Sequence, residues 1–160
     1  MFRYFQNVFR PVVRYAGKNT WNVAGLNHVA VVVPNIEAAS DFYRDTFGVK
    51  VDEPTQAKEH GVTVAFVHFG NTKIELLSPL GEGSPVAKFL EKNKNGGLHH
   101  VCIEVDNLGE AIRGIKQKNL RFLAPEPKIG ACGLPIIFMN PKDASGVLTE
   151  LEETHSKEGH

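Results

Sequence analysis

Four residues have the types and the spacing that metal chemistry would need: His28, Glu75, His100 and Glu150. The two histidines open similar segments, residues 26–31 (LNHVAV) and 98–103 (LHHVCI), and a glutamate in an apolar run follows each of them. An imidazole and a carboxylate from each of two related units could bind one divalent metal ion. A metal held in this way implies chemistry rather than packing, so the sequence predicts a metal centre shared by two halves of the chain.

The predicted ligand set contains two nitrogen and two oxygen donors. Such mixed ligation suits Co²⁺, Mn²⁺, Ni²⁺, Fe²⁺ or Zn²⁺ and leaves positions open on a six-coordinate ion. Both glutamates lie among leucine and isoleucine residues, where a carboxylate would be costly to bury without a cation or another partner. The residues alone do not choose among these ions.

A neighbouring histidine, His99, is the alternative to His100 as a ligand. Successive side chains of an extended strand point to opposite faces. The offset of 72 residues that aligns His100 with His28 also aligns His99 with Asn27. We therefore expect His100 to face the metal and His99 to lie behind it or on the surface. We expect His60 and His68, which have no counterpart in the other half, to be structural or solvent-facing.

The offset of 72 residues extends beyond the histidines and indicates an internal repeat. It aligns Asn35 with Asn107 and Ala39 with Ala111. Each unit begins with alternating residues typical of a strand, continues with apolar residues at helical spacing, and ends with a hairpin pattern. Residues 24–77 and 96–151 are thus predicted to be two βαβββ modules.

The expected elements can be given by residue range. In the first module we expect a strand after His28 that stops at Pro34, a helix over Ile36–Phe47 ended by Gly48, a strand near Lys50–Asp52, and a hairpin of Val62–Phe69 with Thr72–Leu77. In the second we expect a strand over Val101–Val105, a helix carrying Leu108, Ala111, Ile112 and Ile115, a strand over Leu120–Leu123, and a hairpin of Ile136–Met139 with Val147–Leu151. A connector, residues 78–95, should contain a short helix over Val86–Lys92.

Composition and charge limit the possible classes of protein. The chain has 160 residues, of which 42% are hydrophobic and 22% charged, which is typical of one globular domain or of two small halves with a common core. The two cysteines, Cys102 and Cys132, form no CxxC pair and read as free thiols of a reducing compartment. No basic stripe with interleaved aromatic residues indicates nucleic-acid binding. No apolar run approaches the ~20 residues of a membrane span.

The first 23 residues differ from the rest of the chain in charge. They contain four basic residues and no acid, whereas residues 24–160 contain 14 basic and 18 acidic residues. Phe2, Phe5 and Phe9 fall on one side of a helical wheel, with the arginines on the other. An acid-free, arginine-bearing amphipathic segment is typical of a mitochondrial presequence. We therefore expect residues 1–23 to be a targeting segment, 24–153 a single domain, and 154–160 a polar tail.

Several motifs of the domain resemble those of a known enzyme family. The stretches 26–30 (LNHVA), 70–77 (GNTKIELL), 97–105 (GLHHVCIEV) and 146–151 (GVLTEL) resemble the vicinal oxygen chelate, or glyoxalase-like, superfamily, and within it the methylmalonyl-CoA epimerase family. The resemblance covers about residues 24–153. It implies an α+β fold in which two βαβββ modules form a curled mixed sheet around a metal cleft. It also implies a divalent cofactor, Co²⁺ by family, a mitochondrial matrix location, and a possible homodimer.

The resemblance also implies a reaction. A family member interconverts the (R) and (S) forms of methylmalonyl-CoA by 1,1-proton transfer through a metal-stabilised enolate, in the catabolism of propionyl-CoA, branched-chain amino acids and odd-chain fatty acids. Inversion needs proton transfer on opposite faces of a planar enolate. The hypothesis is that Glu150 and Glu75, besides serving as ligands, are the two proton carriers. Lys73, Lys128 and Lys142 are candidates for contacting the nucleotide of the substrate.

Three other functions remain open at this point. A glyoxalase I-like enzyme would isomerise hemithioacetals of glutathione with a similar set of ligands. An extradiol dioxygenase would use two histidines and one glutamate on Fe²⁺. A non-enzymatic small-molecule-binding protein of the same fold would need no metal ligands, whereas all four candidates are present here.

Overall fold

The computed structural model describes residues 20–154, which form one mixed sheet with three α-helices around it. The strands are β1 (Val23–Val32), β2 (Lys50–Val51), β3 (Thr55–Ala57), β4 (Val62–His68), β5 (Lys73–Pro79), β6 (Gly97–Val105), β7 (Lys128–Ile129), β8 (Pro135–Met139) and β9 (Thr149–Glu153). The helices are α1 (Ile36–Phe47), α2 (Ala87–Lys92) and α3 (Leu108–Lys116), and 3-10 turns cover Lys58–His60 and Pro141–Asp143. Among these residues, no helix has both the length and the apolar character to cross a membrane.

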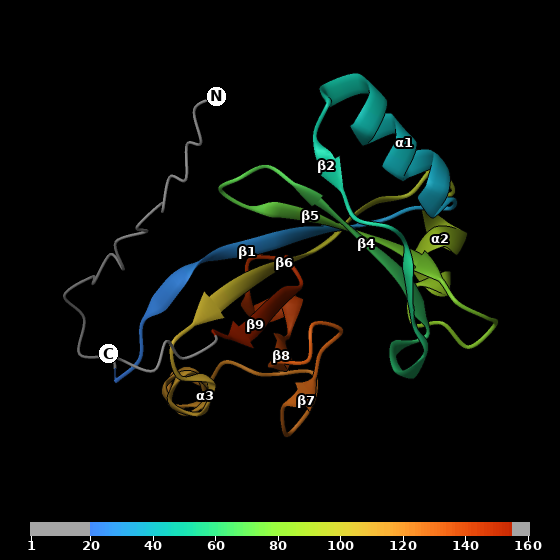
Figure 1. Ribbon diagram of the computed structural model, residues 1–160. Helices are drawn as coiled ribbons and strands as arrows, with labels where there is room; N and C mark the ends of the chain where they lie inside the picture. The colour runs from blue at the N-terminus through green and yellow to red at the C-terminus, as the bar shows by residue number, and fades with distance from the viewer. Residues whose placement is uncertain (1–19, 155–160) are drawn as a thin grey trace, which may run out of the picture.

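The order of the strands shows the duplication directly. It reads β2-β4-β5-β1-β6-β9-β8-β7, with β3 paired to β4. The first strand of each module pairs in parallel with the last, β1 with β5 and β6 with β9, and the modules join through the antiparallel pair of β1 and β6. In Figure 1 these two strands cross the centre of the molecule, with β2, β4, β5 and α1 on one side and β7, β8, β9 and α3 on the other. The expected α+β fold of two βαβββ modules is confirmed.

The two long helices begin in the same way. The side chains of Asn35 and Asn107 accept hydrogen bonds from the backbone N–H groups of Ala38 and Glu110, at 2.8 and 2.9 Å, and so satisfy a free donor of the first turn. Helix α1 ends at Gly48, whose φ of 63° is in the left-handed region that glycine tolerates. Both predicted helices and their aligned caps are therefore present.

One predicted strand is absent from the second module. Residues 120–123 make only an isolated bridge, between Phe122 and Met139. Pro125 and Pro127 follow closely and have no backbone N–H to donate, so a regular ladder cannot continue there. The prediction of a strand over Leu120–Leu123 was wrong, and β7 provides the outer strand of this module.

The core is divided between the modules. In the second module, α3 packs its buried residues against Val105, Ile137 and Leu151 of the sheet. In the first, one cluster lies beneath α1 and a second contains Ala30 and Val32 of β1, packed against Phe89 and Leu90. Because Ala30 and Val32 follow His28 at intervals of two residues, this second cluster continues the face that carries the histidine.

Residues just before β1 also belong to the folded domain. The backbone and side chain of Asn22 donate to the Asp106 carboxylate at 2.7 Å each, and the Thr20 hydroxyl donates to Glu110 at 2.5 Å. Trp21 packs against the core of the second module. Residues 20–23, which we expected in the targeting segment, thus contact the domain. Residues 1–19 of the expected presequence and 155–160 of the expected tail lie outside the described residues.

Candidate metal centre

The side chains of the four predicted ligands meet on adjacent central strands. His28 lies on β1, Glu75 on β5, His100 on β6 and Glu150 on β9. The ladder places Glu75 beside Ala30 of β1, and Glu150 beside Cys102 of β6. The distance from the His28 Nε2 is 3.4 Å to a carboxylate oxygen of either glutamate, and that from the His100 Nε2 is 3.7 Å to Glu75 and 3.3 Å to Glu150. The two Nε2 atoms are 3.4 Å apart.

These separations match those of ligands around a single ion. Donor atoms about 2.1 Å from a common metal lie roughly 3.0 Å apart at right angles and about 3.4 Å apart at the tetrahedral angle. All four residues are buried, and His28 is only 2% exposed. Two buried carboxylates facing two imidazole Nε2 atoms form a donor set that suits a divalent cation, because the cation would neutralise their charge. The centre can therefore hold a divalent metal ion.

The electrostatics of the centre reflect the close approach of these groups. Burial alone would lower the pKa of His28, but hydrogen bonds to Glu150 and Glu75 and the charges of both carboxylates outweigh it and raise the pKa to about 9. Burial likewise opposes ionisation of Glu150, yet the hydrogen bonds from His100 and His28 lower its pKa to about 2. Glu150 is thus held as a carboxylate that bridges the two modules.

Cys102 lies next to this centre, but its thiol is a poor candidate for a metal ligand. Its sulfur approaches His28 and Glu150 closely enough to be a potential ligand. Burial and the charge of Glu150 raise the pKa of the thiol well above its usual range, and a protonated thiol is a poor ligand. We interpret Cys102 as a small packing residue of the inner face.

A cavity of about 280 Å³ opens onto three of the four candidate ligands, Glu75, His100 and Glu150. Its wall combines apolar residues of both modules with His60, His99 and Lys128. A small acyl group bound here would lie directly against both carboxylates. Lys128, a candidate from the sequence, therefore lines this cavity, and so does His60, which was expected to be structural or solvent-facing.

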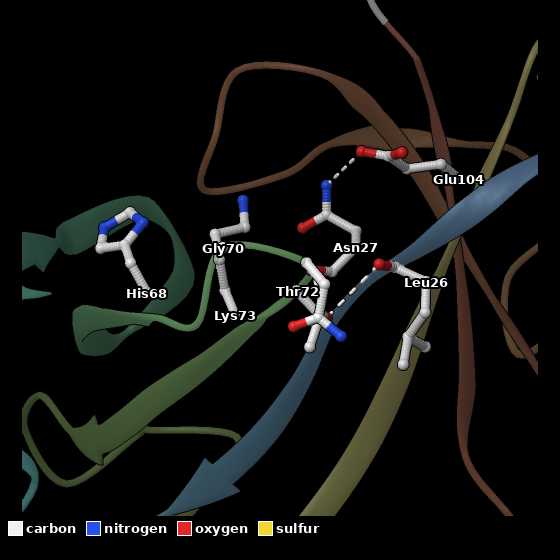
Figure 2. Close-up of a pocket in the computed structure, with 8 residues that line it drawn as sticks. Leu26, Asn27, His68, Gly70, Thr72, Lys73 and Glu104 are labelled. Carbon is white, nitrogen blue, oxygen red and sulfur yellow. Dashed lines mark hydrogen bonds between the residues drawn. The ribbon is translucent and has the colours of Figure 1, made fainter. Parts of the chain in front are cut away.

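A second, more polar cavity is lined in part by Asn27, the residue before His28. Its volume is about 300 Å³, and Asn27, Lys73, His68 and Glu104 are among its lining residues (Figure 2). The Lys73 ammonium lies 4.9 Å from the centroid of the Phe66 ring. His68 pairs with Asp52 at 2.8 Å. Lys142, the third lysine proposed from the sequence, borders neither of these two cavities.

Two residues contact the candidate histidine ligands from the position before each: Asn27, which sequence reasoning did not single out, and His99, which it expected behind His100 or on the surface. The Asn27 Oδ1 lies 2.8 Å from the Nδ1 of His28, and the His99 Nδ1 lies 2.9 Å from the Nδ1 of His100. Regular alternation alone would send His99 to the opposite face, but the structure places it against the Nδ1 of His100, which agrees with the expected position behind that ring. The register between β1 and β6 skips His99 between its pairs at His100 and Leu98, and this irregularity turns the side chain toward His100. The aligned polar residues one position before each histidine were the available signal.

Comparisons with known proteins show what the whole chain is similar to. Residues 27–138 match the model of the glyoxalase/bleomycin resistance protein/dioxygenase superfamily. The mitochondrial methylmalonyl-CoA epimerase of Mus musculus is 58% identical over 133 residues, which cover 83% of this chain and 75% of the mouse protein. The crystal structure of methylmalonyl-CoA epimerase from Mycobacterium tuberculosis superimposes with a TM-score of 0.78 at 29% identity, over 90% of this chain and 95% of that one. A methylmalonyl-CoA epimerase in complex with methylmalonyl-CoA and NH₄⁺ superimposes with a TM-score of 0.75 at 32% identity, over 85% and 98%.

Proposed function

We propose that this chain interconverts the (R) and (S) forms of methylmalonyl-CoA. The premise is that the chain belongs to the methylmalonyl-CoA epimerases of the glyoxalase/bleomycin resistance protein/dioxygenase superfamily. The protein is an isomerase, and its substrate is a thioester whose α-carbon also carries a carboxylate. The observation that carries this function is the placement of two buried carboxylates from two-fold-related strands against one centre.

Epimerisation requires two proton carriers on opposite sides of one carbon. Removal of the α-proton leaves a planar enolate, and inversion requires that a different group deliver a proton to the other face. Glu75 extends from β5 of the first module and Glu150 from β9 of the second. Their relation by the module duplication supports assigning one carboxylate to each face, with the substrate carbon between them.

The chain's own residues would hold the cofactor and the substrate. His28, His100, Glu75 and Glu150 would be the ligands of a divalent ion, which would act as a Lewis acid toward the thioester carbonyl and the carboxylate of the substrate. Co²⁺ is the ion we propose from the family, with Mn²⁺, Ni²⁺, Fe²⁺ and Zn²⁺ as the alternatives that the donor set accepts. The cavity of about 280 Å³ would receive the acyl group, and its apolar wall would exclude water from the enolate.

Location and assembly belong to the same proposal. Several curated relatives are named as mitochondrial, and the acid-free segment of residues 1–23 supports import into the matrix with removal upstream of Thr20, whose contacts belong to the domain. We also propose a homodimer. Import of the full chain into isolated mitochondria, with N-terminal sequencing of the product, tests the first point. Light scattering of the purified product tests the second.

The reaction is tested by following stereochemistry and hydrogen exchange together. Purified protein is stripped with chelator, reloaded with Co²⁺, and incubated with (R)- or (S)-methylmalonyl-CoA in D₂O. We expect conversion of each epimer to the other with incorporation of deuterium at the α-carbon, and loss of both in the stripped protein. If the loaded protein isomerises the glutathione hemithioacetal of methylglyoxal and leaves methylmalonyl-CoA unchanged, the proposal is wrong.

A further inference from the structure

The two candidate histidine ligands each have a second contact, and in both cases the preceding residue makes it. The Nδ1 of His28 faces the Asn27 Oδ1 at 2.8 Å, and the Nδ1 of His100 faces the His99 Nδ1 at 2.9 Å. In both rings the Nε2 points instead to the cluster of carboxylates. Each imidazole thus has a polar contact at Nδ1 and directs its Nε2 toward the candidate metal centre.

The backbone makes this contact possible through two irregularities in one ladder. Neighbouring residues in a regular strand face opposite ways, so Asn27 and His99 could not reach the following ring in an ideal ladder. The register between β1 and β6 shifts once between Leu26 and His28 and once between Ala30 and Val31, where His99 is skipped. Irregularities of this kind re-aim side chains next to functional sites. Here one occurs in front of each histidine, at positions 72 residues apart.

The partners of Asn27 determine which of its atoms faces His28. Its Nδ2 donates to the Glu104 Oε1 at 2.6 Å and to the Glu152 Oε1 at 3.0 Å, and Figure 2 shows the amide pointing from β1 toward Glu104. Because the amide nitrogen donates to the two carboxylates, the atom that faces His28 is the amide oxygen, which can only accept a hydrogen bond. His28 therefore donates from Nδ1, and the neutral form of the ring presents the lone pair of Nε2 to the centre.

The contact in the second module has the same consequence with a different acceptor. Of two imidazoles that meet Nδ1 to Nδ1, one donates and the other accepts. His100 can present a lone pair at Nε2 when it is the donor, which makes the His99 Nδ1 the acceptor. The His99 ring also packs edge-on against Phe89, with ring centroids 5.3 Å apart. His99 therefore combines a packing contact with a hydrogen bond, and the two can be separated by mutation.

We propose that Asn27 and His99 are a duplicated pair of positioning residues that fix the tautomer and orientation of His28 and His100 and thereby set the affinity of the centre for divalent metal. This inference rests on the metal centre of the proposed function. It does not depend on the identity of the substrate. Partners of this kind behind ligand histidines typically contribute 10- to 100-fold to metal affinity.

Two substitutions at one position separate positioning from packing. His99→Phe keeps an aromatic ring against Phe89 and removes the acceptor, whereas His99→Asn removes the ring and supplies the acceptor that the first module uses at Asn27. We expect His99→Phe to weaken Co²⁺ or Zn²⁺ binding by roughly 10- to 100-fold, and His99→Asn to stay within about threefold of the unmodified protein. Asn27→Leu should resemble His99→Phe.

Two readouts other than epimerase activity decide the test. Competition with a chelating dye gives the metal affinity of each folded variant. In the Zn²⁺-loaded protein, long-range ¹H–¹⁵N correlation spectra should show His28 and His100 ligated at Nε2, each with a hydrogen-bonded proton on Nδ1. In His99→Phe, the hydrogen-bonded Nδ1 proton of His100 should be lost.

The inference is overturned if His99→Phe binds metal as tightly as the unmodified protein, because packing against Phe89 would then explain the contact. It is also overturned if His99→Asn is as weak as His99→Phe, because an acceptor at this position would then not set the metal affinity. If the unmodified protein binds Zn²⁺ with the expected Nδ1 protons yet leaves methylmalonyl-CoA unchanged, the proposed function fails and the positioning role stands.

Discussion

Helices α1 and α3 occupy equivalent places in the two modules, yet they are buried very differently. Helix α3 buries Leu108 and three further residues, whereas α1 buries only Ile36 and Ser40 and leaves Phe47 57% exposed. Their aligned asparagine caps and the central strands beneath them correspond closely. The two modules therefore agree where they supply the centre and differ at the periphery. This pattern is expected if geometry is constrained only near the chemistry.

The largest expected effect comes from breaking the equivalence of the two glutamates. In Glu150→Gln and Glu75→Gln the side chain keeps its shape but can no longer take up a proton. We expect each variant to lose α-hydrogen exchange from one epimer by 10²- to 10⁴-fold, and the two variants to affect opposite epimers. Proton NMR of (R)- and (S)-methylmalonyl-CoA in D₂O measures both rates.

A matched control separates proton transfer from loss of the metal. Glu126→Gln makes the same change on an exposed side chain and should leave both rates unchanged. Metal content is measured for every variant, because both glutamates are also candidate ligands. If Glu150→Gln retains metal and exchanges both epimers at the normal rates, Glu150 is a ligand only and the division of faces is wrong.

The next effect tests the difference between the two helices. Leu108→Ala removes a 2% exposed side chain from the core beneath α3 and should cost roughly 2–5 kcal/mol of unfolding free energy, since a cavity remains. Phe47→Ala removes a half-exposed ring whose aromatic contacts are with Phe42 and Tyr43. This substitution should cost about 1 kcal/mol or less of unfolding free energy. Urea unfolding of the metal-loaded protein measures both.

Equal losses of unfolding free energy in Leu108→Ala and Phe47→Ala would contradict the difference in burial between α3 and α1. They would show that Phe47 is covered in solution, and a second copy of the chain is the natural cover for an aromatic surface. In that case the cost of Phe47→Ala would grow with protein concentration. Leu108→Ala would not show this dependence, so the two variants control each other.

The sequence predicted that the four candidate ligands would meet because the repeat places them at equivalent positions of two related modules. With His28 and His100 at equivalent points of two strands, and Glu75 and Glu150 at equivalent points of two others, a two-fold arrangement brings all four together. The roles of Asn27 and His99 could not be read in this way. Strand alternation is a local rule, whereas the register shifts that re-aim these residues depend on how β1 pairs with β6 across the whole sheet.

The smallest expected effect tests the link between the modules. His28 of β1 contacts Glu150 of β9, so this ion pair joins the two halves. The pKa of His28 is raised from 6.5 to about 9, so the stability that it contributes is fully present below pH 6.5 and is lost as the pH rises through 9. The pKa of Glu150 is lowered from 4.5 to about 2, so its contribution is present above pH 4.5 and is lost as the pH falls through 2.

Because both shifts describe one contact, this ion pair should contribute most to the stability of the metal-free protein between about pH 4.5 and 6.5, and its contribution should fall by at most about 3 kcal/mol between pH 6.5 and 9. Urea unfolding of chelator-treated protein across this range measures the loss. His28→Gln should abolish it, whereas His60→Gln, outside the ion pair, should keep it. An unchanged pH dependence in His28→Gln would mean that other groups produce it. The cross-module ion pair would then contribute little to holding the two halves together.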